Sequence, residues 1–267
     1  MIIEQISRVL ATKQDLHDKL KIWYIKEVLQ AYILSYIYSH VDYGQIIFYG
    51  GTALRFCHDL DRLSEDLDFV GVGFSLQDEL WHDLKKYFSH YWLTCDIKRQ
   101  KFRTTLKFRN ILKHFNLSFG NSIDLYVKIE ISTHFDFATD YKEEFFARHK
   151  YGQSILIRSF RIEDLMWTKL NAVLYRAWTN ERQGVSFKGR DIYDLYRYLA
   201  KKVKPTIGCI EWVESYKQLK DMLTKKIKSI NFSEAILDIQ SFIENEKQLP
   251  FFKEYAKTFM LWEIAKW

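Results

Sequence analysis

Two neighbouring stretches decide how this chain folds, Gly50-Gly51-Thr52-Ala53-Leu54-Arg55 and Arg62-Leu63-Ser64-Glu65-Asp66-Leu67-Asp68-Phe69. The β-branched and aromatic run Gln45–Tyr49 precedes them and is typical of a strand, which the two glycines end in a tight turn. A helix is expected from Thr52 to about Leu60, with Thr52 as its N-cap. Asp66 to Val72 alternates between polar and apolar residues, which predicts a second strand. The order is therefore strand, glycine turn, helix, strand.

Hydrophobic periodicity predicts helices before these stretches and a mixed sheet around them. Apolar residues recur at spacings of three and four over residues 3–41 and 77–91, which is typical of amphipathic helices. Further strands are expected at 92–97, 104–108, 123–131 and 154–157, in a mixed sheet with antiparallel edges. Helical patterns dominate afterwards, at 162–179, 189–203, 209–228, 232–245 and 250–264. We therefore expect an α+β fold with two regions, 1–160 and 161–267, the second of them helical.

The composition is that of a folded globular protein, with 48% hydrophobic and 28% charged residues. Most of the aromatic residues, 17% of the chain, are expected in the core because large rings are costly to leave in water. Only two prolines and ten glycines favour long helices without interruptions. The net charge of +6 permits a polyanionic partner such as nucleic acid, but it is equally typical of an ordinary solvated surface.

Cysteine usage and the apolar runs exclude several classes of protein. The three cysteines, Cys57, Cys95 and Cys209, are scattered and odd in number, which argues against a disulfide framework, and no Cys/His spacing resembles a zinc site. The N-terminus lacks the basic and apolar regions of a signal peptide. The longest apolar run, Ala31–Tyr38, is too short to span a bilayer. We expect a cytoplasmic protein that does not contact a membrane.

Asp66 and Asp68 are the first candidates for chemistry. Residues two apart in a strand point to the same face, so the two carboxylates emerge side by side, roughly 7 Å apart, while Leu67 and Phe69 point into the core. A bound cation would relieve the repulsion between them, and oxygen ligands select hard ions such as Mg²⁺. Two solvated aspartates on a half-exposed strand are the alternative interpretation.

The glycine turn adds an anion site to this pair. Gly50 and Gly51 let the backbone approach a ligand closely, and the helix that follows would direct its free N–H groups and positive dipole end at an anion. Thr52 adds a hydroxyl. A tight connection without a ligand is the alternative, and the absence of a Gly-x-x-x-x-Gly-Lys-Ser/Thr pattern disfavours a P-loop NTPase. Together, turn and carboxylates suit a nucleoside triphosphate and its Mg²⁺ ions.

The strand expected at 123–131 supplies further polar side chains. Ile123, Leu125, Val127, Ile129 and Ile131 form its apolar face, and Lys128 and Glu130 lie on the polar face. If this strand neighbours Asp66 and Asp68, Glu130 completes a three-carboxylate cluster able to hold two magnesium ions. Lys128 could then neutralise phosphate charge or pair with a carboxylate. A solvated sheet face is the alternative.

Two helical segments carry charged candidates. Lys169 lies within the apolar arc of the helix that begins at Ile162, where an ammonium group needs an anion, so we expect it to face a triphosphate; snorkelling or a structural ion pair with Glu163 are the alternatives. In the helix expected at 189–203, Arg190, Asp191 and Asp194 share a polar face at spacings that permit ion pairs within the helix.

A basic stretch interleaved with aromatic residues covers positions 98–109. Thr105, Lys107 and Arg109 would share one strand face there. Such a surface could contact a nucleic-acid backbone, or it could be a solvated hairpin.

In combination these residues resemble the AbiEii/AbiGii toxin family, nucleotidyltransferase-like toxins of bacterial toxin–antitoxin and phage-defence systems. The resemblance rests on residues 50–55 with Arg62-x-Ser64-x-Asp66-Leu-Asp68-Phe69, and continues through Lys128-Ile-Glu130, the Glu163-Asp-Leu-x-x-x-Lys169 helix and Arg190-Asp191-x-x-Asp194. It covers about residues 48–200. It implies a polymerase-β-type nucleotidyltransferase fold, with a sheet-based catalytic half and a helical C-terminal half. The superfamily turn is often Gly-Ser, whereas this chain has Gly51-Thr52 and keeps the hydroxyl.

The resemblance also implies roles for individual residues. Asp66 and Asp68, assisted by Glu130, would be ligands of two Mg²⁺ ions; Lys169 and Asp191 would join them as catalytic residues. The nucleotide would be contacted by Gly50, Gly51, Thr52, Ser64, Lys128, Lys169 and Arg190. The expected activity is transfer of NMP from an NTP to an acceptor hydroxyl on tRNA or another RNA, with a cognate DNA-binding antitoxin as a partner. A catalytically silent nucleotide-binding protein and an enzyme that nucleotidylates a protein hydroxyl are the alternatives.

Overall fold

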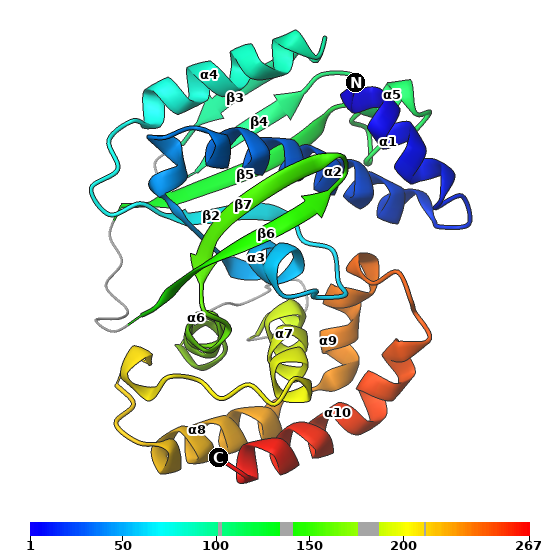
Figure 1. Ribbon diagram of the computed structural model, residues 1–267. Helices are drawn as coiled ribbons and strands as arrows, with labels where there is room; N and C mark the ends of the chain where they lie inside the picture. The colour runs from blue at the N-terminus through cyan, green and yellow to red at the C-terminus, as the bar shows by residue number, and fades with distance from the viewer. Residues whose placement is uncertain (101–102, 134–140, 176–186, 211) are drawn as a thin grey trace. The chain divides into compact units, whose positions relative to one another are not determined.

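A computed structural model describes residues 1–100, 103–133, 141–175, 187–210 and 212–267 (Figure 1). The chain divides into two compact units. Unit 1 comprises Met1–Phe135 with Glu143–Ser159, and unit 2 comprises Asp136–Lys142 with Phe160–Trp267. Among the described residues, unit 1 contains the mixed sheet and unit 2 contains helices α6 to α10. The expected α+β class, with a helical C-terminal half, is confirmed.

The first elements of unit 1 follow the predicted order with shifted bounds. They are α1 (Ile2–Ala11), α2 (Asp18–Ser39), the 3-10 turn η1 (Tyr43–Gln45), β1 (Ile47–Tyr49), α3 (Gly50–Cys57), β2 (Asp66–Val70) and α4 (Gln77–His90). The helical region predicted at 3–41 is two helices. The polar segment between Ala11 and Asp18 interrupts the apolar pattern, and the side chain of His17 accepts a hydrogen bond from the Leu20 N–H to cap α2.

The remaining elements of unit 1 complete the sheet. They are β3 (Cys95–Arg99), β4 (Thr104–Phe108), α5 (Ile111–His114), β5 (Leu125–Ser132), β6 (Glu143–Lys150) and β7 (Gln153–Phe160). The strand order is β3-β4-β5-β2-β1-β7-β6, with β2 parallel to β5 and antiparallel to β1. Strand β6 was not predicted, because its charged sequence does not alternate. Its pairing with β7 follows a tight turn in which Tyr151 and Gly152 both have positive φ.

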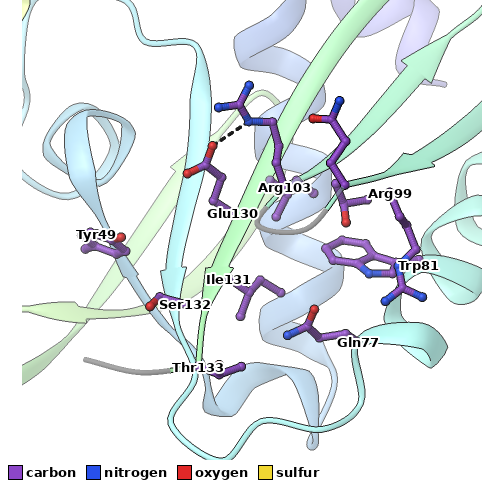
Figure 2. A pocket seen from close by; sticks show the side chains of 12 residues that line it. Tyr49, Gln77, Trp81, Arg99, Arg103, Glu130, Ile131, Ser132 and Thr133 are labelled. Atoms are coloured by element: carbon purple, nitrogen blue, oxygen red, sulfur yellow. Dashed lines mark hydrogen bonds and ion pairs between the residues drawn. The ribbon is translucent and has the colours of Figure 1, made fainter. Parts of the chain in front are cut away.

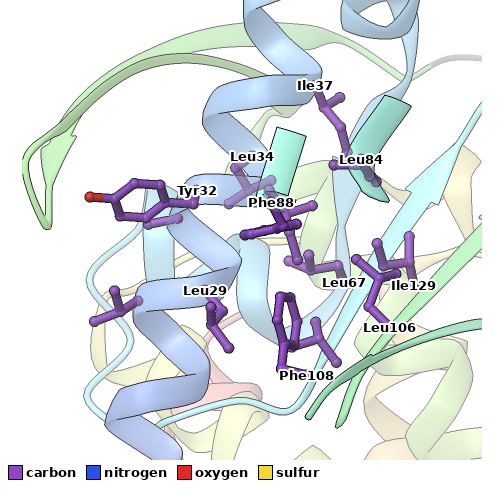
Figure 3. Close-up of a cluster of buried hydrophobic side chains, with 14 of the residues drawn as sticks. Leu29, Tyr32, Leu34, Ile37, Leu67, Leu84, Phe88, Leu106, Phe108 and Ile129 are labelled. Carbon is purple, nitrogen blue, oxygen red and sulfur yellow. The ribbon is translucent and has the colours of Figure 1, made fainter. Parts of the chain in front are cut away.

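The core of unit 1 lies against one face of this sheet (Figure 3). Leu67 of β2 and Ile129 of β5 point toward side chains of α2 and α4, including Leu34 and Phe88. These four side chains are at most 1% exposed, and burying each stabilises the fold by about 1.5–3 kcal/mol. Since strand side chains alternate, Asp66, Asp68 and Glu130 are held on the opposite face.

Unit 2 is built from the helices α6 (Ile162–Tyr175), α7 (Gly189–Ala200), α8 (Tyr216–Ser229), α9 (Phe232–Ile239) and α10 (Gln248–Ala265), with 3-10 turns at Ile207–Cys209 and Gln240–Phe242. The helix predicted at 209–228 begins later, at Tyr216, because the side chain of Ser215 caps it by accepting the Gln218 N–H. Residues 176–179, the end of the helix predicted at 162–179, lie outside the described residues. Across the described residues, no helix combines the length and apolar character that a membrane crossing needs.

Candidate active site

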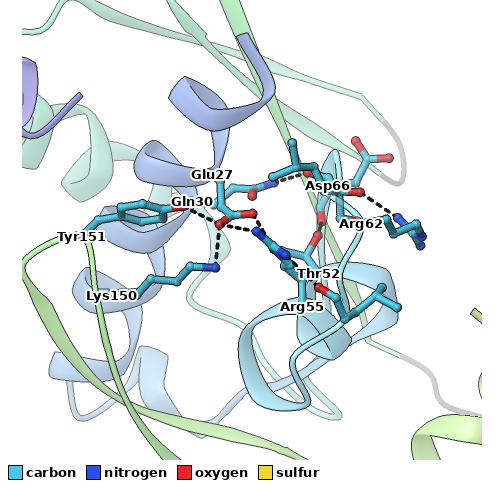
Figure 4. A network of polar contacts seen from close by, with 11 residues as sticks. Glu27, Gln30, Thr52, Arg55, Arg62, Asp66, Lys150 and Tyr151 are labelled. Atoms are coloured by element: carbon cyan, nitrogen blue, oxygen red, sulfur yellow. Dashed lines mark hydrogen bonds and ion pairs between the residues drawn. The ribbon is translucent and has the colours of Figure 1, made fainter. Parts of the chain in front are cut away.

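The glycine turn between β1 and α3 begins the helix earlier than the sequence suggested. Helix α3 starts at Gly50 with Tyr49 as its N-cap, so the prediction of Thr52 as the N-cap was wrong. Thr52 is buried, and its hydroxyl donates a hydrogen bond to the backbone carbonyl of Asp66 (Figure 4). The hydroxyl therefore ties the turn to the start of β2 instead of capping the helix.

At both positions of the turn only glycine fits, because neighbouring side chains lie where a Cβ atom would stand. Gly50 has φ +80°, and a Cβ at this position would lie 2.3 Å from Oδ2 of Asp68. A Cβ on Gly51 would lie 2.7 Å from Nη2 of Arg62 and 3.0 Å from Oγ of Ser64. The turn thus packs directly against Asp68 and Ser64, which brings together three of the predicted nucleotide-contacting residues and one predicted metal ligand.

The sheet register places the predicted carboxylates in adjacent positions. Strands β2 and β5 are parallel neighbours, with Asp68 opposite Glu130 and Asp66 opposite Lys128. Tyr49 of β1 lies opposite Asp68 on the other side of β2. Because paired residues share a face, these side chains occupy one polar surface at the end of the glycine turn.

The charges on this surface are only partly compensated. Nζ of Lys128 lies 3.9 Å from Oδ1 of Asp66, and that oxygen is buried without a hydrogen-bond partner. Burial raises the pKa of Asp66, because removal from water disfavours the ionised form more than the Lys128 charge favours it. Glu130 accepts a 2.7 Å hydrogen bond from Nε of Arg103. That hydrogen bond raises the pKa of Arg103, with smaller contributions from Asp66 and Asp68.

The donor set fits a hard cation through Asp66 and Asp68. Carboxylate oxygens are the ligands that Mg²⁺ prefers, and Oδ1 of Asp66, buried without a hydrogen bond, is the kind of group that a cation would satisfy. Glu130 is occupied by Arg103 in this conformation. Consistently, the described part of the chain contains no group of three His, Cys, Asp or Glu side chains gathered closely enough to hold an ion.

A buried residue of α2 holds the segment that leads into Asp66. Gln30 is 0% exposed, and its Nε2 donates to the carbonyls of Ser64 and Glu65 at 3.2 and 3.0 Å. Sequence reasoning missed Gln30 and also Arg103. The available signal for Gln30 was a polar residue inside the long apolar pattern of residues 3–41.

A second buried contact links α2 to α3. Glu27, 1% exposed, accepts hydrogen bonds from Arg55 of α3 and from Tyr151, and it pairs with Lys150 (Figure 4). Because Arg55 belongs to the helix that starts at the glycine turn, this network fixes the orientation of α3.

The predicted site residues of unit 2 contact one another. Nζ of Lys169 on α6 lies 2.8 Å from Oδ1 of Asp191 and 2.8 Å from Oδ2 of Asp194, both on α7. The backbone N–H of Arg190 donates to Asp238 of α9 at 3.1 Å. The inward-facing Lys169 therefore has carboxylate partners that the sequence did not identify, and Glu163 pairs with Arg161.

The described residues of the basic stretch, 98–100 and 103–109, belong to or adjoin β3 and β4, where their charges meet acidic partners. Lys107 pairs with Asp124 at 2.9 Å, Arg109 with Asp96, and Arg99 with Asp78. These partners compensate much of the positive charge that the sequence suggested for this strand face.

Comparisons with known proteins agree on the class of this fold. The chain resembles JHP933 from Helicobacter pylori with a TM-score of 0.50 and 17% identity, over 90% of this chain and 92% of that one. It resembles MenT4, the nucleotidyltransferase toxin Rv2826c from Mycobacterium tuberculosis H37Rv, with a TM-score of 0.50 and 16% identity, over 91% and 85% of the two chains. At these identities the likeness shows the fold alone. No curated protein matches the chain.

The family of the chain is given by a sequence model. The model described as "Nucleotidyl transferase AbiEii toxin, Type IV TA system" matches residues 33–258, which include every site residue discussed above apart from Glu27 and Gln30. The match covers most of the chain and contains the glycine turn and the Asp66–Asp68 pair in order. The chain belongs to the AbiEii nucleotidyltransferase toxin family and is a nucleotidyltransferase of a toxin–antitoxin system.

Proposed function

We propose that this nucleotidyltransferase transfers NMP from an NTP to a hydroxyl of an RNA acceptor, in the first place tRNA, in a Mg²⁺-dependent reaction. The observation that carries the proposal is the sheet register, which sets Asp66 and Asp68 beside Glu130 and against the Gly50 turn. The net charge of +6 favours a polyanionic acceptor. Transfer to tRNA assigns the reaction to the cytoplasm, with a DNA-binding antitoxin as the partner.

Each residue of the site has a distinct role in this proposal. Asp66 and Asp68 hold the Mg²⁺ ions, which when bound neutralise phosphate charge and activate the attacking hydroxyl. The free N–H groups at the start of α3, next to Gly50 and Gly51, bind the triphosphate. Lys128, beside Asp66, balances the charge of the phosphates, and Glu130 faces the acceptor. Positioning and electrostatic stabilisation supply most of the rate, as is general for phosphoryl-group chemistry.

The residues of unit 2 enter this proposal separately. Lys169, Arg190 and Asp191 are proposed to contact the nucleotide from the helical unit. The carboxylates around Lys169 give it a structural role as well.

The test compares Asp68→Asn with Asp96→Asn. Each NTP, radiolabelled at the α-phosphate, is incubated with total tRNA and Mg²⁺, and label in RNA is measured. We expect Asp68→Asn to lower the initial rate by about 100-fold or more, because it removes a charged metal ligand. Asp96→Asn changes a carboxylate of the edge strand β3 whose exposed pair with Arg109 contributes little, so its rate should stay close to that of the wild type.

Other outcomes are equally informative. Equal labelling by the wild type and Asp68→Asn contradicts the mechanism. Label recovered in protein instead of RNA would show that the acceptor is a protein hydroxyl. Saturable NTP binding without transfer to any acceptor makes the chain a silent nucleotide-binding protein.

A further inference from the structure

A cavity of about 610 Å³ lies beside the end of β5, entirely within unit 1 (Figure 2). The register of β4 against β5 explains where the cavity lies. The pairing of the two strands begins at Thr104 opposite Ile129, whereas β5 continues to Ser132 without β4 beside it. The last residues of β5 therefore border the cavity, with Trp81 of α4 and the end of the β3–β4 hairpin around it. Glu130 belongs both to this border and to the row of carboxylates.

The lining of the cavity has the chemistry that a nucleotide needs. Arg103 offers a guanidinium group for a phosphate, and so does Arg99, whose exposed ion pair with Asp78 contributes little. Gln77 and Gln100 offer carboxamides for the edge of a base. Trp81 forms part of the wall of the cavity together with Ile129 and Ile131, so a base can pack against apolar groups there. The volume lies within the range of small-molecule sites, roughly 300–1,000 Å³.

Trp81 provides an independent sign that a ligand belongs here. Its side chain lines the cavity but is only 4% exposed, and in the described part of the chain its indole N–H has no hydrogen-bond acceptor. Buried donors in folded proteins are nearly always paired, so an unpaired one beside a cavity marks a position for an acceptor atom such as a base carbonyl.

The order of the strands indicates whether the cavity would bind the NTP or a nucleotide of the acceptor. The glycine turn follows β1, the two aspartates are on β2, Glu130 is on β5, and Arg103 precedes β4, in the spatial order β1-β2-β5-β4. In phosphoryl-group transfer the attacking and leaving oxygens are roughly in line. If the triphosphate occupies the glycine turn, the acceptor approaches from the β5–β4 side, where most of the residues that line the cavity lie; Tyr49, the N-cap of α3, borders the cavity on the side of the turn.

We infer that this cavity binds the terminal nucleotide of the RNA acceptor, with Trp81 donating to its base and Arg99 and Arg103 holding its phosphates. The inference rests on the proposed function and adds the acceptor subsite to it. It also gives Arg103 a double role: an RNA phosphate would compete with Glu130 for its guanidinium group and leave Glu130 free to face Asp68.

The experiment measures RNA binding and NTP binding separately. Affinity for 5′-labelled hexaribonucleotides of A, C or U with free 3′-hydroxyls is measured by fluorescence anisotropy without NTP. Affinity for a non-hydrolysable NTP with Mg²⁺ is measured by calorimetry. Trp81→Phe keeps the ring but removes the N–H, and we expect about fivefold weaker binding of the hexamers with unchanged NTP affinity.

Trp23→Phe is the matched control. Trp23 is also a buried tryptophan, but it lies against Phe119 and not in the cavity. Arg99→Gln is a second variant on an exposed residue, and it should flatten the dependence of log affinity on log salt concentration by about 0.7. If Trp81→Phe does not fold, the salt dependence of hexamer binding by Arg99→Gln tests the inference instead.

The outcomes separate this inference from the proposed function. Unchanged hexamer affinity in both cavity variants overturns the inference even where labelling of RNA proceeds. A loss of NTP affinity in Trp81→Phe, with hexamer affinity intact, overturns it by assigning the cavity to the NTP. Trp81-dependent hexamer binding without any transfer supports the subsite and contradicts the proposed reaction.

Discussion

Glu27 is the residue on which the buried polar contacts of α2 converge. It is 1% exposed and meets Lys150 at 2.5 Å and Arg55 at 2.9 Å. Burial alone would raise the pKa of this carboxyl group, but the charges of Lys150 and Arg55 outweigh it and lower the pKa below its usual value of 4.5. The ionised form therefore contributes to stability, although part of its energy only offsets desolvation.

Replacing Glu27 by Gln should lower the free energy of unfolding at neutral pH by about 3–5 kcal/mol, because two partly buried cations lose their counter-charge. Since folding lowers the pKa of Glu27, its contribution is present above pH 4.5 and is lost as the pH falls through the lowered value. The difference between the wild type and Glu27→Gln should therefore shrink in acid. Urea unfolding at neutral and acidic pH measures it, with the exposed Glu79→Gln as control. A difference that does not depend on pH would contradict this account.

Individual residues also show how far sequence reasoning reached. The alternation of a strand was enough to place Asp66 and Asp68 together, and to put Glu130 on the polar face of its own strand. It did not identify Gln30 or Arg103, because their hydrogen bonds join residues 34, 35 and 27 positions apart. For Lys169 the helical pattern indicated an inward charge, but it contained no information on which carboxylates of another helix would meet it.

At the scale of elements, Lys169 of α6 forms ion pairs with two carboxylates of α7. Lys169 is 12% exposed, and its partners Asp191 and Asp194 are 8% and 0% exposed. Two buried carboxylates without a cation are strongly unfavourable. The pairing thus fixes α6 against α7 whether or not Lys169 also binds phosphate.

Lys169→Met should therefore lower the free energy of unfolding by about 3–5 kcal/mol, whereas Lys169→Arg keeps the charge and most of the stability. The predicted phosphate contact adds a second expectation, a weaker NTP affinity of Lys169→Met at a temperature where the variant remains folded. Chemical unfolding and calorimetry measure the two effects. Lost stability with unchanged NTP affinity would leave Lys169 with the structural role alone.

The elements themselves were predicted unevenly, for physical reasons. Strand β4 has the bounds that its sequence predicted, Thr104–Phe108, because three of its five side chains are buried in strict alternation. Strand β6 gave no such pattern, since an edge strand owes its pairing to the neighbouring strand β7 and to the turn at Tyr151 and Gly152. Helix α3 begins at Gly50, before the predicted start at Thr52, and Gly50 has a positive φ; an apolar pattern records neither feature.

For the whole molecule, membership of a toxin family makes growth the relevant readout. We expect induced synthesis of the wild-type chain in a bacterial host to stop growth, because uncontrolled nucleotide transfer would inactivate its acceptor. Asp68→Asn, which removes a proposed metal ligand, should be tolerated, and Asp96→Asn should remain toxic. Colony counts at matched protein levels measure this. Growth arrest by Asp68→Asn would assign toxicity to something other than transfer.

The support that α2 gives to the site has a consequence for designing shorter versions of this protein. Glu27 and Gln30 precede the stretch that matches the family model, which begins at residue 33. They nevertheless hold Arg55 and the backbone that leads into Asp66. An expression fragment trimmed to the matched stretch would keep every proposed metal ligand and yet lose the hydrogen bonds that orient them. A fragment should therefore retain α2 with its cap His17, and also α1, whose Ile2 and Ile6 are buried in the core of unit 1.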